Sequence, residues 1–283
     1  MPARRSPTIR RRRLAAELRR LREEAGLTIE RVAKALEFSE SKVSRLETAH
    51  VTATPRDVRD LLELYGVAGS QRDELVQMAR EAREKGWWFK YRDHHADQAS
   101  YVGLEVAADS IRIYKALAVP GLLQTAEYAQ AVIRALYPGD SPGELGRRLE
   151  LRMARQPILA EADPPGLWAI LDEAALHRTI GGPEVLRQQL HHLVAQAQLP
   201  NVTLQVLPYV AGAHAALDGS FDILGFDEPG DPDVVHIETF TSQFYLERPE
   251  EVRWYALIFD LLRASALAPD DSIEFIAQAA GRL

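Results

Sequence analysis

Cysteine is absent from the 283-residue sequence. This absence excludes disulfide bonds, thiolate metal sites and cysteine nucleophiles, and it fits the reducing conditions of a cytoplasm. Hydrophobic runs are short, and none approaches the roughly 18 apolar residues that a membrane-spanning helix needs. The basic start MPARRSPTIRRRR leads into the charged, amphipathic LAAELRRLREE, which lacks the apolar segment of a signal peptide. We therefore expect a cytoplasmic protein with no membrane partner.

Motifs for catalysis and cofactor binding are also missing. The segments IGGPE and VAGAH lack the strand–GxGxxG–helix or GKS/T surroundings that cradle phosphates, and no Gly-x-Ser-x-Gly sequence occurs. His191 and His192 are neighbours on a predicted helix, so their side chains point about 100° apart and do not hold one metal ion together. The remaining histidines and the carboxylates that a fold would have to bring to them are scattered: His177, His214, His236, Asp172, Glu173, Asp218 and Glu238. We predict no enzymatic activity, no cofactor and no metal site.

The net charge of −7 conceals two regions of opposite sign. Residues 1–92 contain 21 Lys and Arg against 14 Asp and Glu, a net charge of +7, whereas residues 93–283 contain 13 against 27, a net charge of −14. The length and the 46% of hydrophobic residues allow two packed domains. The asymmetry predicts domains with different partners: the basic one either binds nucleic acid or presents a solvated surface without a ligand.

Five short helices are predicted in residues 1–85. Leu14, Leu18 and Leu21 recur at the i, i+4, i+7 spacing of an amphipathic helix over residues 9–24, and Gly26 ends this helix. The next four helices begin at the capping residues Thr28, Ser39, Thr54 and Ser70. The last two of these caps are followed three positions later by an aspartate.

The third of these helices, within SESKVSRLETAH, has an unusually thin apolar side. Only Val43 and Leu46 are large apolar residues, and its other positions are small, polar or charged. Two apolar residues suffice to dock the helix, so its opposite face points outward. A short helix that follows another after a tight turn and presents polar groups is typical of a helix-turn-helix, whose second helix enters the major groove of DNA.

The segment LTIERVAKALEFSESKVSRLE resembles the core of Cro/C1-type (XRE-type) helix-turn-helix regulators, and the resemblance covers residues 14–66. It implies an all-α five-helix DNA-binding domain. The family usually has glycine in the turn where this chain has Glu37. A left-handed backbone at Glu37 would cost about 1–2 kcal/mol.

Matching positions in this resemblance imply the DNA contacts. Glu40, Ser41 and Arg45 would face base edges, where a bidentate arginine–guanine pair gives about 1–3 kcal/mol of discrimination. The residues expected near phosphates are Thr28, Ser39, Lys42 and Ser44.

The arginine run that begins at Arg10 and ends at Arg13 has two interpretations. It adds phosphate contacts or a minor-groove arm, or it is only the solvated start of a helix. Glu47, by contrast, is interpreted as structural, in a hydrogen bond within the fold.

Residues 86–100 are predicted to form an aromatic linker. Trp87, Trp88, Phe89 and Tyr91 either pack into a domain interface or stack on single-stranded bases. Residues 101–283 mix strands and helices, which predicts an α+β domain with a mixed sheet. The expected strands lie in IRIYKALAVPG, GLWAILDEAAL, NVTLQVLPY, GSFDILGF and DVVHIETF, with helices at TAEYAQAVIRAL, after Ser141, after Pro183, and over residues 249–268 and 272–283.

This second region also has a family resemblance. VPGLLQTAEYA, LDEAALHRTIGGPEVLRQQLHHL and HIETFTSQFYLE are similar to the large carboxy-terminal domain of certain actinobacterial Cro/C1-type regulators. Their genes often neighbour one for a small protein, in a toxin–antitoxin-like or developmental pairing. The resemblance implies a domain for dimerisation and for binding an effector or a partner protein.

Three functions remain open from the sequence. The first is a nucleoid-associated transcriptional regulator that binds double-stranded DNA as a homodimer, with the recognition helix over residues 39–48. The second is an antitoxin-like module that mainly binds a small partner protein encoded nearby. The third is an enzyme tethered to DNA, whose turnover would have to depend on His214 or Glu173.

Overall fold

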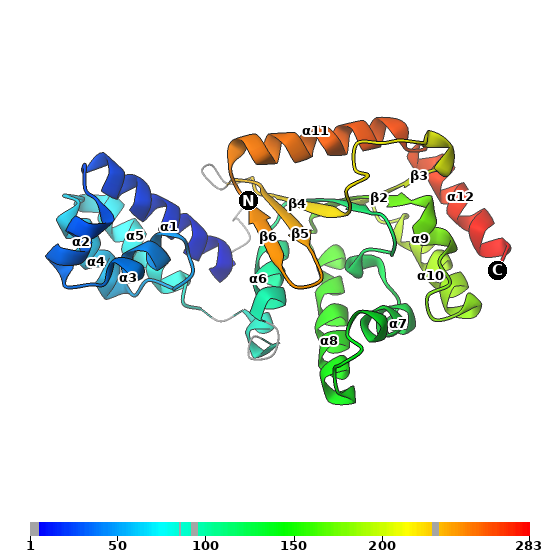
Figure 1. The fold of residues 1–283 in the computed structure, drawn as a ribbon, viewed down its shortest axis with the longest axis horizontal. Coiled ribbons are helices and arrows are strands. Elements are labelled where there is room, and N and C mark those ends of the chain that lie inside the picture. The colour runs from blue at the N-terminus through cyan, green and yellow to red at the C-terminus, as the bar shows by residue number, and fades with distance from the viewer. Residues whose placement is uncertain (1–5, 85, 92–95, 228–231) are drawn as a thin grey trace. The chain divides into compact units, whose positions relative to one another are not determined.

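The computed structural model describes residues 6–84, 86–91, 96–227 and 232–283 (Figure 1). Residues 1–5 of the basic start and 92–95 of the predicted linker lie outside the described residues. The chain divides into two compact units, the first ending at Ala107 and the second beginning at Ala108. The first is helical and the second contains a six-stranded sheet with helices. The predicted fold class, an all-α domain followed by an α+β domain, is confirmed.

The first unit contains the five predicted helices and one core. Their bounds are α1 Pro7–Glu24, α2 Ile29–Leu36, α3 Glu40–Glu47, α4 Pro55–Leu64 and α5 Gly69–Glu81. Leu14, Leu18 and Leu21 are buried in this core, as their spacing predicts. Thr28, Ser39 and Thr54 each accept a backbone N–H of the following helix, so these capping predictions are confirmed.

The predicted start of α5 is wrong. This helix begins at Gly69 and not after Ser70, and the residue that precedes it, Ala68, makes no side-chain cap. Gly69 has a φ of +66°, a backbone conformation that glycine adopts without a steric penalty. The helix therefore begins before the predicted cap, and Ser70 lies inside its first turn.

Two helical elements follow that were not predicted as helices: a 3₁₀-helix, η1 (Trp87–Tyr91), and α6 (Ala96–Glu105). Trp88 and Tyr91 are buried, whereas Trp87 is 40% exposed. The α6 backbone lies so close to α1 that a Cβ atom added to Gly103 would collide with the Thr8 side chain. Ser6 Oγ also donates a hydrogen bond of 2.5 Å to the Gly103 carbonyl. These contacts make η1 and α6 part of the first unit.

The second unit is built on one mixed sheet with the strand order β3-β2-β1-β4-β5-β6. Strands β1, β2 and β3 are parallel to one another, and β4, β5 and β6 are added antiparallel. The strand bounds are β1 Ser110–Lys115, β2 Gly166–Asp172, β3 Val202–Leu207, β4 Phe221–Gly225, β5 Val234–Glu238 and β6 Gln243–Leu246. The first five strands were predicted. The sixth was missed, because it is a four-residue edge strand without a buried face.

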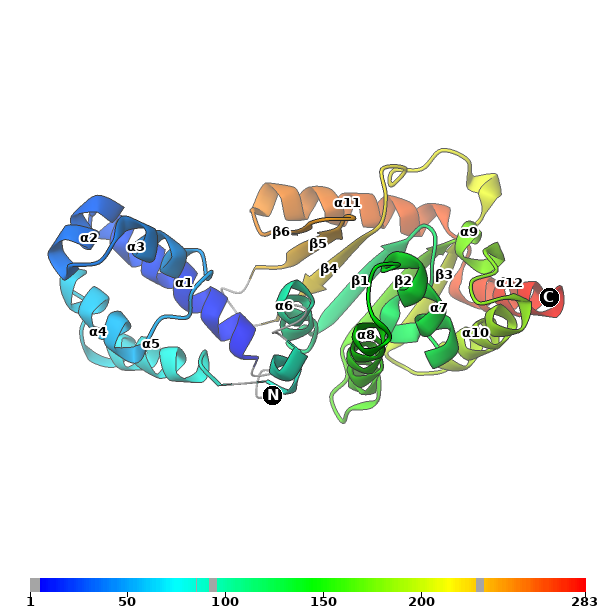
Figure 2. The same cartoon turned by 60° about the horizontal axis from the view of Figure 1, so that its bottom comes forward.

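Helices cover both sides of this sheet. The α-helices are α7 Ala126–Leu136, α8 Pro142–Arg155, α9 Glu173–His177, α10 Pro183–Gln196, α11 Pro249–Ser265 and α12 Pro269–Gly281. Three short 3₁₀-helices are η2 Gly121–Leu123, η3 Gln156–Ala160 and η4 Tyr209–Ala211. Helix α11 lies along one face, where Phe259 and Leu262 pack against Tyr114 and Phe221, and α7 and α8 lie on the other side (Figure 2). No helix of the described residues has the length and apolarity to cross a membrane.

Candidate nucleic-acid interface

Helices α2 and α3 are joined by a tight turn that depends on Glu37. This residue has a φ of 55° and a ψ of 34°, which is the left-handed conformation. Its backbone N–H and that of Phe38 both donate to the Ala33 carbonyl, so the turn closes the end of α2. The chain thus forms the turn with a residue for which the left-handed backbone costs about 1–2 kcal/mol relative to the right-handed one.

One side of α3 is fixed in the core. Val43 is 1% exposed and Leu46 is 2% exposed. Beside them the two carboxylate oxygens of Glu47 accept hydrogen bonds of 2.7 and 3.0 Å from Arg22 of α1. The prediction that Glu47 is structural is confirmed, and this bidentate pair fixes α3 against α1.

The opposite side of α3 carries the three residues predicted to read bases. Glu40, Ser41 and Arg45 are all exposed. Arg45 Nε donates a hydrogen bond of 3.1 Å to the Ser41 carbonyl, which holds the start of the guanidinium group against its own helix. The structure therefore brings a carboxylate, a hydroxyl and a guanidinium onto one outward surface.

The residues predicted near phosphates have different surroundings. Thr28 and Ser39 cap α2 and α3, accepting the Arg31 and Lys42 N–H groups at 3.2 and 3.1 Å. Such helix N-termini attract anions, because backbone N–H groups and the helix dipole point the same way. Ser44 is partly buried.

Lys42 is engaged within the protein. Its Nζ lies 2.7 Å from Asp57 Oδ1 and 3.4 Å from the centre of the Phe38 ring. Its charge is therefore largely balanced by Asp57. The pair also brings the first turn of α4 alongside α3, and that turn carries Arg56, whose side chain is 86% exposed. Sequence reasoning missed Arg56, since no local signal shows that α4 lies next to α3.

Arg10 and Arg13 lie within α1 and not in an extended arm. Arg10 Nε is 3.3 Å from Glu81 Oε2, and the two side chains are only 20% and 22% exposed. Arg13 is partly buried. Arg10 thus links α1 to the last residue of α5.

In the second unit the fold brings together several of the scattered titratable residues, near the carboxyl ends of β2 and β3. Glu173 lies 3.2 Å from His177 Nε2 and accepts the Tyr209 N–H at 2.8 Å. His214 Nε2 is 4.0 Å from Asp172 Oδ2. Among the described residues no group of three or more such side chains is arranged to hold a metal ion.

The match to known families agrees with this geometry. Residues 13–75, which span α2 and α3, match the family model described as a helix-turn-helix domain. The first unit therefore places the protein in the class of helix-turn-helix, DNA-binding regulators. Residues 98–278 match the model of a domain of unknown function, DUF5753, and because this match covers more than half of the chain, the chain belongs to that family. No curated protein and no solved structure matches the chain.

Proposed function

We propose that the protein is a sequence-specific transcriptional regulator of the Cro/C1 type that inserts α3 into the major groove of DNA. The observation that carries the proposal is the outward placement of Glu40, Ser41 and Arg45 on a helix whose other side is fixed by Glu47 and Arg22. The groove admits one helix, and its floor presents donors and acceptors that these three side chains complement. Thr28, Ser39 and Ser44 then lie towards phosphates, with Arg56 added on the α4 side.

The proposal extends to the whole chain. The protein acts in the cytoplasm at the nucleoid, as a homodimer whose two α3 helices lie about 34 Å apart on a palindromic operator. The second unit, which begins at Ala108, supplies dimerisation and binds an effector or a partner protein, as in the actinobacterial regulators that its sequence resembles. Its net negative charge disfavours a second DNA surface there.

Helix α11 provides a surface for a second copy. Trp254, Leu257 and Leu261 form an apolar stripe on this helix, and they are 59%, 48% and 49% exposed. Arg253 and Asp260 both follow the same flank of the stripe, since they are seven residues apart.

The charges along this flank favour an antiparallel pair of α11 helices. With a twofold axis near Leu257, Arg253 of one copy faces Asp260 of the second, and Trp254 faces Leu261. A parallel pair would instead set like charges at the same height. The arrangement matches opposite charges and covers the stripe at once, which is why we assign it to the homodimer.

The test of DNA recognition begins with capture of genomic fragments by the purified protein, followed by binding measurements on the recovered sequence. Arg45→Ala and Glu40→Ala are expected to lose base preference and about tenfold or more in affinity. Arg187→Ala, which removes an exposed arginine of α10, is the charge-matched control and is expected to bind like the wild type. Unchanged affinity and preference in both α3 variants would disprove the recognition-helix assignment.

A second candidate function is that of an antitoxin-like module that binds a small protein encoded nearby. The observation in its favour is an apolar surface at the β5–β6 hairpin, where Phe240 is fully exposed and Phe244 is 49% exposed. Co-purification of the neighbouring gene product with the wild type, and its loss with Phe240→Ser/Phe244→Ser, would support this function. Retention of the product by that variant would count against the hairpin.

A further inference from the structure

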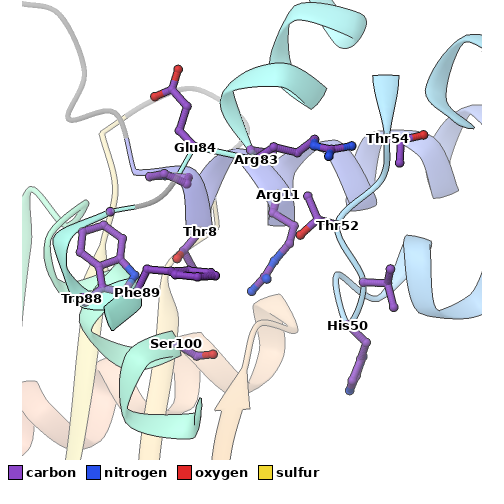
Figure 3. A pocket seen from close by; sticks show the side chains of 14 residues that line it. Thr8, Arg11, His50, Thr52, Thr54, Arg83, Glu84, Trp88, Phe89 and Ser100 are labelled. Atoms are coloured by element: carbon purple, nitrogen blue, oxygen red, sulfur yellow. The ribbon is translucent and has the colours of Figure 1, made fainter. Parts of the chain in front are cut away.

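The first unit contains a cavity of about 490 Å³. Its wall is assembled from α1, the loop between α3 and α4, the end of α5, η1 and α6. Figure 3 shows Arg11, Thr52, Phe89 and Ser100 around its central space. The volume falls within the range of about 300–1,000 Å³ that is usual for sites of small organic ligands.

One side of the cavity is aromatic. Trp88 and Phe89 follow each other in η1 and both line the space. A Cβ atom on Gly86 would lie within 2.6 Å of Trp88 ring atoms, so the glycine lets the backbone pass directly against the indole. Trp88 as a whole is 7% exposed, so its side chain is held in place. A planar ring can stack or pack edge-on against these two side chains.

The other side is cationic and rich in hydroxyl groups. Arg11 and Arg83 line the cavity together with the hydroxyl residues Thr8, Thr52, Thr54 and Ser100. Among the described residues that line the cavity, only Glu84 has a carboxylate, and this group points away from Arg11 and Phe89 (Figure 3). Arginines bind carboxylates through paired N–H groups, and hydroxyl groups add further hydrogen bonds.

We infer that this cavity binds a small planar aromatic carboxylate. The ring would lie against Phe89 and Trp88, and the carboxylate would meet Arg83. Among the described residues that line the cavity, none belongs to the recognition surface of α3. The site is therefore separate from the proposed DNA contacts.

The position of the cavity gives the ligand a route to DNA binding. His50, Val51 and Thr52 belong to the loop that follows α3 and form part of the wall. This loop includes Ala49, whose φ of 57° is unfavourable for a residue with a side chain, and the Val51 N–H donates to the Arg45 carbonyl at 3.2 Å. A ligand that presses on the loop would shift α3. This coupling, unlike the site itself, rests on the proposed function.

The site is tested without DNA by calorimetric titration of the full-length protein with benzoate, salicylate and indole-3-acetate. We expect saturable one-to-one binding of at least one acid, and weaker binding of its neutral amide. Arg83→Gln and Phe89→Ala should each weaken that binding by about tenfold or more. Arg80→Gln, which removes an exposed α5 arginine outside the cavity, should not.

Two results would overturn the site: no saturable binding of any of the three acids up to about 10 mM, or equal binding by Phe89→Ala, Arg83→Gln and the wild type. Circular dichroism melting of each variant shows that a loss of binding is not a loss of folding. The captured operator then tests the coupling, and saturation with ligand should change the DNA affinity by about fivefold or more. Ligand binding with unchanged DNA affinity would refute the coupling, whereas absence of DNA binding at any ligand concentration would refute the proposed function and leave the site standing.

Discussion

Arg22 of α1 and Glu47 of α3 form a buried bidentate ion pair, with side chains that are 10% and 5% exposed. The Glu47 carboxylate accepts the Arg22 Nε and Nη2 groups, and Arg22 Nη1 also donates to the Leu27 carbonyl at 2.8 Å. Through this pair the orientation of α3 depends on α1. The outward direction of Arg45 is thus a consequence of a contact made on the opposite side of the same helix.

Removing one member of this pair should destabilise the first unit strongly. Glu47→Ala leaves the Arg22 guanidinium buried without its partner, which costs about 3–5 kcal/mol. Chemical denaturation followed by circular dichroism measures the loss. The double variant Arg22→Met/Glu47→Leu should recover much of it, and a loss of less than about 1 kcal/mol in Glu47→Ala would show that the pair is not buried in solution.

Glycine at position 37 should stabilise the protein. Glu37 adopts a left-handed backbone that glycine adopts freely, so Glu37→Gly is expected to raise the free energy of unfolding by about 1 kcal/mol. Glu37→Ala keeps the steric cost and serves as the control. Destabilisation by Glu37→Gly would mean that this turn has a different conformation in solution.

Asp57 should make stability depend on pH. Burial raises the pKa of its carboxyl, but hydrogen bonds from Lys42 and Thr54 outweigh burial and hold the pKa below its usual value. A carboxyl with a depressed pKa stabilises the folded state above the ordinary carboxyl pKa, and this stabilisation is lost as the pH falls through the lowered value. Asp57→Asn should therefore lose less stability than the wild type between about pH 5 and about pH 2. Asp73→Asn, an exposed position on α5, is the control, and an Asp57→Asn profile parallel to that of the wild type would contradict the expectation.

Gly103 should not tolerate a side chain. A Cβ atom there would collide with Thr8 of α1, so Gly103→Ala is expected to cost about 1–3 kcal/mol through overpacking. Thr8→Ala removes the nearest atom and should restore part of the stability in the double variant. Thermal melts of the four proteins complete the cycle, and additive effects would show that α6 does not lie against α1.

Charge exchange on α11 tests the proposed homodimer. Asp260→Arg sets like charges opposite each other in the antiparallel pair and should shift the protein towards monomer, whereas Arg253→Asp/Asp260→Arg should restore the dimer. Leu257→Asp should prevent association at any salt concentration, because it sets a charge at the centre of the stripe. Sedimentation analysis measures the association, and a wild type that stays monomeric at about 100 μM would exclude this interface.

The features that the sequence predicts correctly are local ones. Thr28, Ser39 and Thr54 cap helices because the signal and the structure lie within four residues of each other. The β6 strand lacks such a signal, since it exists only by pairing with β5. The position of Lys42 was not foreseen for the same reason: its partner, Asp57, is fifteen residues away along the chain. The cavity lay beyond prediction, because its wall joins five segments.

Helix α6 has a practical consequence for dividing the chain. Its sequence lies largely in the DUF5753 match, which starts at residue 98, yet its contacts are with α1. A fragment that stops at residue 85 would lack Gly103, which packs against Thr8 and accepts the Ser6 hydroxyl, whereas one that stops after Ala107 would keep both contacts. The DUF5753 match therefore begins inside a helix that packs against the helix-turn-helix unit, so a helix-turn-helix fragment that folds well by itself must include the start of that match.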